Sequence, residues 1–149
     1  MNAANGFEFL EHTADAKFRA HGKTLDEAFA NAATAMFSSM TDCDKVKPAV
    51  KKEISVEAAD LKALLYSFLE ELVFMLDTED FLLNRVDKLS IEENKIGRVQ
   101  APGYALMATV SGDRAEGYET QSLVKAVTYS DMEVIEKKGA CSVVVVVDI

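Results

Sequence analysis

Apolar and polar residues alternate in two short stretches near the start of the chain. Residues 7–10 predict a first β-strand, and the residues that follow Asp15 predict a second. The second stretch puts charged residues on one face and apolar residues on the other, as a half-buried strand requires. Its apolar members are Ala16, Phe18 and Ala20.

The next segment has the period of an amphipathic helix. Thr24 and Glu27 have the spacing of a capping box, so we expect this helix to begin directly after Thr24. Apolar residues then recur in steps of three and one and form a single stripe. The stripe consists of Leu25, Ala28, Phe29, Ala32, Ala33, Met36, Phe37 and Met40.

A second helix is predicted after Asp60, which is a candidate N-cap. Its stripe consists of Leu61, Leu64, Leu65, Phe68, Leu69, Leu72, Val73 and Leu76. Tyr66, Phe74 and Met75 lie off this stripe, which we interpret as burial on two sides of the helix. A docking patch on the protein surface is the alternative.

The remaining chain is rich in predicted strands. One lies between the helices, over residues 52–58, and the others cover 81–83, 86–92, 104–110, 122–129, 132–137 and 142–148. We expect residues 111–117 to form a polar loop. This order predicts an α+β fold, a single domain over residues 1–149 in which two amphipathic helices pack on one face of a mostly antiparallel β-sheet.

The net charge of the chain indicates which kinds of macromolecule it can bind. The 149 residues include 25 acidic side chains against 16 Lys plus Arg, a net charge of −9. Such a surface repels phosphate backbones, so direct high-affinity binding of nucleic acid is not expected, whereas a basic protein partner would be attracted. The lysines at positions 45, 47, 51 and 52 have acidic neighbours, and we interpret them as a solvated edge rather than an RNA-binding patch.

The two cysteines are expected to be free thiols, and the apolar runs predict neither a signal peptide nor a membrane span. Cys43 lies between Asp42 and Asp44, which disfavour its thiolate, and Cys141 leads into an apolar strand as core filler. The N-terminal residues have no apolar core of a signal peptide, and no run approaches the ~20 residues of a membrane span. We therefore expect a cytoplasmic protein that does not associate with membranes.

The C-terminal residues are a candidate metal site. Val143 to Val147 are apolar on both faces of a strand, which predicts a strand inside the core. The run ends at Asp148 and Ile149, so a side-chain carboxylate and an α-carboxylate lie one residue apart. Oxygen ligands of this kind suit a hard cation such as Ca²⁺ or Mg²⁺. A terminus frayed into solvent is the alternative.

Two further residues are candidates for chemistry. Lys125 lies in the apolar segment 123–129, where a lysine either pairs with an anion or guards the edge of a sheet. His12 lies in the polar segment 11–15 between the first two strands, where a hydrogen-bonded turn histidine is commoner than a catalytic one. The chain contains no HExxH, GxSxG, P-loop or GxGxxG motif and no zinc-type Cys/His spacing.

At these same residues the sequence resembles the archease family. The resemblance runs from Phe7 to Ile149 and rests on FEFLEHTADAKFRAHGKTLDEAFANAATAMF, LLYSFLEELVFMLDTE, VKAVTY and the terminal VVVVVDI. It implies a small α+β protein that is not itself an enzyme. Members of this family assist the RtcB-type RNA ligase of tRNA splicing, by promoting guanylylation of the ligase's active-site histidine and multiple turnovers.

The resemblance also implies roles for individual residues. Asp15, Asp148 and the Ile149 carboxylate correspond to the family's metal ligands, with Ca²⁺ expected and Mg²⁺ or Mn²⁺ as alternatives. Lys125 corresponds to a lysine required for function, and His12 of the HTAD motif is a second candidate activation residue. Two other functions stay open: a chaperone or modulator of a tRNA-modifying enzyme, and a stand-alone phosphohydrolase that uses the same carboxylates with a metal ion.

Overall fold

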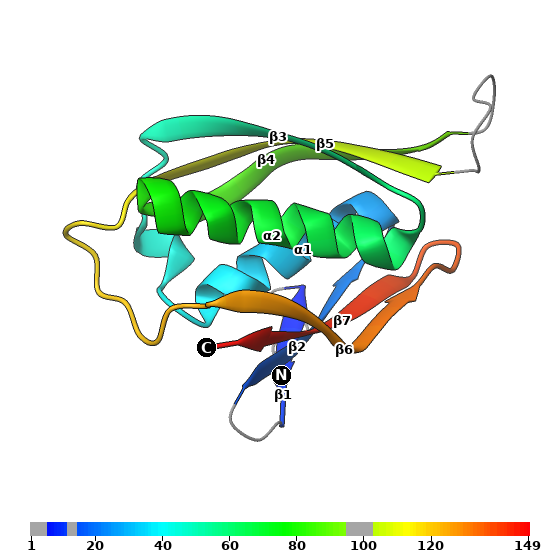
Figure 1. Ribbon diagram of the computed structural model, residues 1–149, viewed down its shortest axis with the longest axis horizontal. Helices are drawn as coiled ribbons and strands as arrows, with labels where there is room; N and C mark the ends of the chain where they lie inside the picture. Colours follow the sequence, from blue (N-terminus) through cyan, green and yellow to red (C-terminus); the bar gives the residue numbers. More distant parts are fainter. Residues whose placement is uncertain (1–5, 12–14, 95–102) are drawn as a thin grey trace.

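Within residues 6–11, 15–94 and 103–149, which the computed structural model describes, two α-helices lie between two antiparallel β-sheets (Figure 1). One sheet has the strand order β1-β2-β7-β6, with bounds Phe7–Leu10, Ala16–Gly22, Cys141–Asp148 and Ala126–Ile135. The other has the order β3-β5-β4, with bounds Val50–Ala58, Gly103–Arg114 and Phe81–Asn94. The helices are α1, Leu25–Ser38, and α2, Leu61–Glu79, and a short 3₁₀ turn, η2, covers Cys43–Lys45.

Both helices begin where the sequence predicts. The backbone N–H of Glu27 donates to Thr24 Oγ1 at 3.1 Å, and Glu27 Oε1 accepts from the N–H of Lys23 at 2.6 Å. At the start of α2 the N–H of Ala63 donates to Asp60 Oδ1 at 2.8 Å. Among the residues described, neither helix is both long and apolar enough to cross a membrane.

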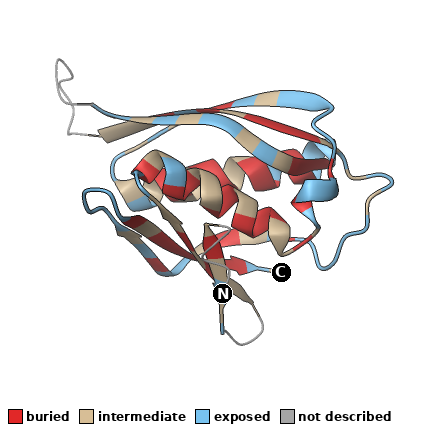
Figure 2. Cartoon of the chain, turned by 180° about the vertical axis from the view of Figure 1, so that it is seen from behind, coloured by how far each residue is buried: buried red, intermediate tan, exposed pale blue. Residues whose placement is uncertain are grey.

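The helices form the middle layer of the fold, which corrects the expectation of one sheet. Helix α1 packs against β2 and β7 on one side and β4 on the other, while α2 packs against β3, β5 and β6. Apolar surface on two sides of each helix is therefore buried, as the colouring of Figure 2 shows. The whole predicted stripe of α1, including Met40 beyond its last turn, is buried. Burial of the off-stripe residues is confirmed for Met75 and wrong for Phe74, which is 57% exposed.

Strand β7 is the most deeply buried strand of its sheet. All five valines from Val143 to Val147 are buried, so both faces of the strand are buried, as predicted. Val143, Val145 and Val147 face the core, where α1 packs against β7. Val144 and Val146 lie on the opposite face, beside residues of the flanking strands: Lys17, Arg19, Thr128 and Glu133. Both cysteines are buried, which agrees with the interpretation of Cys141 as core filler. Burial raises the pKa of the Cys43 thiol to about 11, and the carboxylates of Asp44 and Asp42 act in the same direction.

The predicted boundaries of β4, β5 and β6 are wrong. In β4 and β6 the physical reason is a β-bulge, which interrupts the regular pairing with the neighbouring strand. Residues 81–94 form one continuous strand rather than two, because bulges at Asn84 and Asp87 change the phase of the alternation. Strand β5 continues to Arg114, through the first half of the predicted polar loop. Residues 126–135 form one strand, β6, interrupted by a bulge after Thr128, and residues 122–125 precede it.

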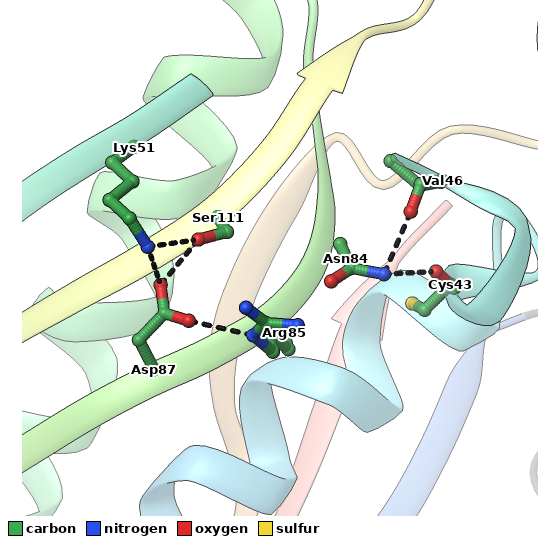
Figure 3. A network of polar contacts seen from close by, with 7 residues as sticks. All are labelled: Cys43, Val46, Lys51, Asn84, Arg85, Asp87 and Ser111. Carbon is green, nitrogen blue, oxygen red and sulfur yellow. Dashed lines mark hydrogen bonds and ion pairs between the residues drawn. The ribbon is translucent and has the colours of Figure 1, made fainter. Parts of the chain in front are cut away.

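Each bulge residue of β4 has a polar role (Figure 3). The side-chain amide of Asn84 donates to the carbonyls of Cys43 at 3.1 Å and Val46 at 2.7 Å, which fixes the η2 turn against the strand. The Asp87 carboxylate accepts hydrogen bonds from Ser111 Oγ, from Arg85 Nε at 2.7 Å and from Lys51 Nζ at 3.2 Å.

The same contacts determine the charge state of Asp87. The hydrogen bond from Ser111, followed by those from Arg85 and Lys51, lowers the pKa of the Asp87 carboxyl to about 2. Lys52 pairs with Glu79 at 2.9 Å. Both lysines are therefore neutralised by carboxylates, in agreement with the interpretation of a solvated edge.

The Asp87 network makes stability depend on pH. Its carboxyl has a lower pKa in the folded chain than in the unfolded chain, so its contribution is complete above about pH 4 and is lost as pH falls toward 2. We predict that Asp87→Asn lowers the free energy of unfolding by about 1 kcal/mol at pH 7, after allowance for solvent screening. In urea unfolding the difference from wild type should shrink at pH 2.5, and a difference that is independent of pH would contradict this assignment.

Candidate functional site

The predicted site residues gather at one end of β7. The pairing of Ala16 with Val147 brings the residue before β2, Asp15, to the next register position, opposite Asp148. On the other side of β7 the backbone N–H of Lys125 donates to the carbonyl of Asp148 at 2.7 Å. The structure therefore brings Asp15, Lys125, Asp148 and Ile149 to one edge, although more than 100 residues separate the first from the last. His12 lies outside the described residues.

The valine run explains why this edge forms where it does. Residues up to Val147 are held in the core by their burial, and Asp148 is the first exposed residue of the strand. Ile149 is half-buried and packs against the core, so the end of the chain is held against the protein.

Lys125 lies in a different setting from the one predicted. It precedes β6 rather than lying within an apolar strand, and its side chain is exposed. Within the described part of the chain, its ammonium forms no ion pair with a carboxylate. The backbone of Lys125 is fixed by Asp148 while its charge is directed to solvent. A charged group presented in this way is available to an anion supplied by another molecule.

The donor chemistry at this edge fits a hard divalent cation. Asp15 and Asp148 contribute carboxylates from adjacent strands, and the main-chain carboxylate of Ile149 follows directly. Within residues 6–11, 15–94 and 103–149, no group of three or more His, Cys, Asp or Glu side chains is arranged to hold a metal ion. The expected ligand set differs from such a group because it combines two acidic side chains with a main-chain carboxylate. All of these donors are oxygen atoms, which Ca²⁺ and Mg²⁺ prefer.

Sequence reasoning missed the residues that position β6 beside this edge. Glu70 of α2 accepts a hydrogen bond from the N–H of Val127 at 2.9 Å, and Tyr66 stacks on Tyr129 with ring centroids 4.4 Å apart. Across β7, Lys17 pairs with Asp131 in the bulge of β6 at 3.4 Å. The place of Tyr66 off the apolar stripe of α2 was the one available signal of these contacts.

Comparison with known proteins identifies relatives along nearly the whole chain. The model of the archease protein family matches residues 7–149. The protein archease of Methanothermobacter thermautotrophicus is 39% identical over 145 residues, which cover 97% of this chain and 99% of the relative. The protein archease of Thermococcus kodakarensis is 42% identical over 130 residues, 86% of this chain and 87% of the relative.

Solved structures share the fold. The solution structure of Methanobacterium thermoautotrophicum protein 1598 is 36% identical, with a TM-score of 0.78 over 97% of this chain and 99% of the other. A crystal structure described as an archease, a possible chaperone, from Thermotoga maritima has a TM-score of 0.60 over 94% of each chain. At 16% identity the second likeness concerns the fold alone.

The exposure of Lys125 generates a stability prediction. Because its ammonium is exposed and its backbone makes the contact with Asp148, Lys125→Met should change the free energy of unfolding by no more than about 0.5 kcal/mol. Urea unfolding at neutral pH measures this. A loss of about 3–5 kcal/mol would instead show that the lysine is one partner of a buried ion pair.

Proposed function

Because the chain belongs to the archease family, we propose that it is a metal-binding accessory protein that activates an RtcB-type RNA ligase by promoting guanylylation of the ligase. The observation that carries this proposal is the meeting of Asp15, Asp148 and Lys125 at one edge, on three neighbouring strands. Two carboxylates, a main-chain carboxylate and an ammonium that forms no ion pair with the described residues would form a site for a cation beside a site for an anion.

Each group has a distinct task in this proposal. Asp15, Asp148 and the Ile149 carboxylate would hold the divalent ion, which supplies positive charge that can neutralise phosphate oxygens. Lys125 would approach a phosphate of the nucleotide, because its ammonium is exposed and lies one residue before the strand that pairs with Asp148. His12, the first residue of the HTAD motif, is the other candidate activation residue.

The charge balance of the chain supports a protein partner. A net charge of −9 favours docking on the basic surface of an RNA-handling enzyme and disfavours direct binding of RNA. The ligase would supply the reacting histidine and the RNA-binding surface. The accessory protein would supply a preformed edge that presents the cation and Lys125 to the ligase's nucleotide site.

Two rival functions make different demands on the same edge. A stand-alone phosphohydrolase needs a general base, and His12 is the sole nearby candidate in the sequence. Phosphatase activity of the purified protein with added metal ion, and without the ligase, would support that rival and contradict our proposal. A chaperone or modulator of a tRNA-modifying enzyme would co-purify with such an enzyme and leave guanylylation unchanged.

The first prediction here concerns the metal ligands. Asp148→Asn removes one anionic oxygen while it preserves the shape of the side chain, so calorimetry with Ca²⁺ or Mg²⁺ should show affinity about tenfold lower or worse. Single-turnover guanylylation of the cognate ligase should lose its stimulation. Glu53→Gln removes the same charge from an exposed position on β3, and this control should match wild type in both assays. Unchanged metal affinity of Asp148→Asn would remove the site.

The second prediction concerns the Ile149 carboxylate. A peptide tag joined after Ile149 replaces this anion with an amide, so C-terminally tagged protein should bind the metal ion more weakly and fail to stimulate the ligase. The same tag at the N-terminus should have no effect. The two tagged proteins should unfold at the same temperature, and equal stimulation by both would show that this carboxylate is not a ligand.

A further inference from the structure

Helix α2 and strand β6 run side by side in opposite directions (Figure 1). Large apolar side chains on these two elements are exposed. Phe74 is 57% exposed and Tyr129 is 54% exposed, although the inner faces of both elements are buried. We call the residues Tyr66, Phe74, Leu123 and Tyr129 the α2–β6 seam. Tyr66 is half-buried and the other three are exposed. Exposed aromatic and aliphatic side chains of this kind are typical of a protein-binding surface.

The seam is held in place by specific contacts. The rings of Tyr66 and Tyr129 are stacked, with 11° between their planes, and one turn later Glu70 accepts from the N–H of Val127. Phe74 lies a further turn along α2, and because β6 runs in the opposite direction, this turn is expected to lie toward residues 123–125, which precede β6. Because these contacts fix the two elements together, a partner would meet a preorganised surface, and less conformational entropy is lost on binding.

Charge identifies the kind of segment that would bind. Three of the four neighbouring positions on the helix face of Phe74 carry carboxylates, Glu70, Glu71 and Asp77, and the fourth is Thr78. A second copy of this chain would bring the same carboxylates to the interface, and the like charges would repel. A segment that carries lysine or arginine around a large apolar side chain would complement both features.

We propose that the α2–β6 seam docks a basic segment of the RNA ligase that carries a large apolar side chain. This inference rests on the proposed function and divides it between two surfaces. The seam ends at residues 123–125, next to the backbone contact between Lys125 and Asp148. A ligase held on the seam is therefore held beside the candidate metal edge, so the seam supplies affinity while the edge supplies activation.

The test measures binding and activation separately on full-length protein. Phe74→Ala removes the most exposed seam side chain, and calorimetry with the cognate ligase should show affinity roughly tenfold weaker than wild type. Met107→Ala is the matched control, because Met107 is 60% exposed on β5, on the far sheet. It should bind like wild type. Thermal unfolding of both variants should match wild type.

Charge reversal tests the second feature of the seam. Glu71→Lys should weaken binding and flatten its salt dependence, since one attractive pair is replaced by a repulsive one. Lys62→Glu, at the start of the same helix, should strengthen binding or leave it unchanged. If Lys62→Glu weakens binding of the ligase while Glu71→Lys leaves it unchanged or strengthens it, the segment that binds the seam is not basic.

The outcomes separate this inference from the function on which it rests. At saturating concentration, Phe74→Ala should stimulate guanylylation within about twofold of wild type, whereas Asp148→Asn should bind the ligase but fail to stimulate it. If wild type binds and stimulates the ligase while Phe74→Ala binds equally well, the seam is not the docking surface and the proposed function stands. If wild type neither binds nor stimulates the ligase, both proposals are wrong.

Discussion

The burial of β7 on both faces is the constraint from which the other features of this fold follow. Five consecutive valines leave no face of the strand that tolerates water, so one face packs on α1 and the core, and residues of the flanking strands β2 and β6 lie beside the valines of the other face. The strand can meet solvent only at its ends. Asp15, Lys125 and Asp148 therefore meet at the end of β7, where the buried strand first reaches solvent.

The helices and their caps could be predicted from the sequence because their signals are local. Each cap residue, Thr24 or Asp60, accepts a hydrogen bond from a backbone N–H in the first turn of its own helix. Each apolar stripe has the period of a helix, and the packing of the helix in the fold keeps this period. The second sheet could not be predicted in this way. Apolar side chains around more than one face of a helix indicate burial, but they do not distinguish a second sheet from a second helix.

The errors in the strands have a different physical origin. A bulge adds one residue to one strand, and it inverts the alternation on which strand prediction depends. Asn84 and Asp87 are placed by partners distant in sequence, the carbonyls of η2 and the hydroxyl of Ser111, so no local pattern marks them. Lys125 was assigned to a strand because the residues around it are apolar. Strand β6 instead begins one residue later, and Lys125 contacts β7 through its backbone N–H, which donates to the carbonyl of Asp148. Asp148 and Ile149 could be chosen as candidates because a buried strand that ends in an acid is visible in the sequence, whereas Asp15 was a candidate ligand only through the resemblance to the archease family.

The pairing of β2 with β7 has a consequence for how the protein is made. Ala16 and Val147 lie side by side in the sheet but are synthesised at opposite ends of the described chain, whereas α1, β3, α2, β4 and β5 emerge from the ribosome between them. The three-stranded sheet is built from consecutive strands of the chain, β3, β4 and β5, so it can assemble on the helices while translation continues. The four-stranded sheet must wait for residues 141–148, and closing so long a loop is slow. During that interval the helix faces that later meet β7 are uncovered, and the candidate site is absent until the last strand is in place.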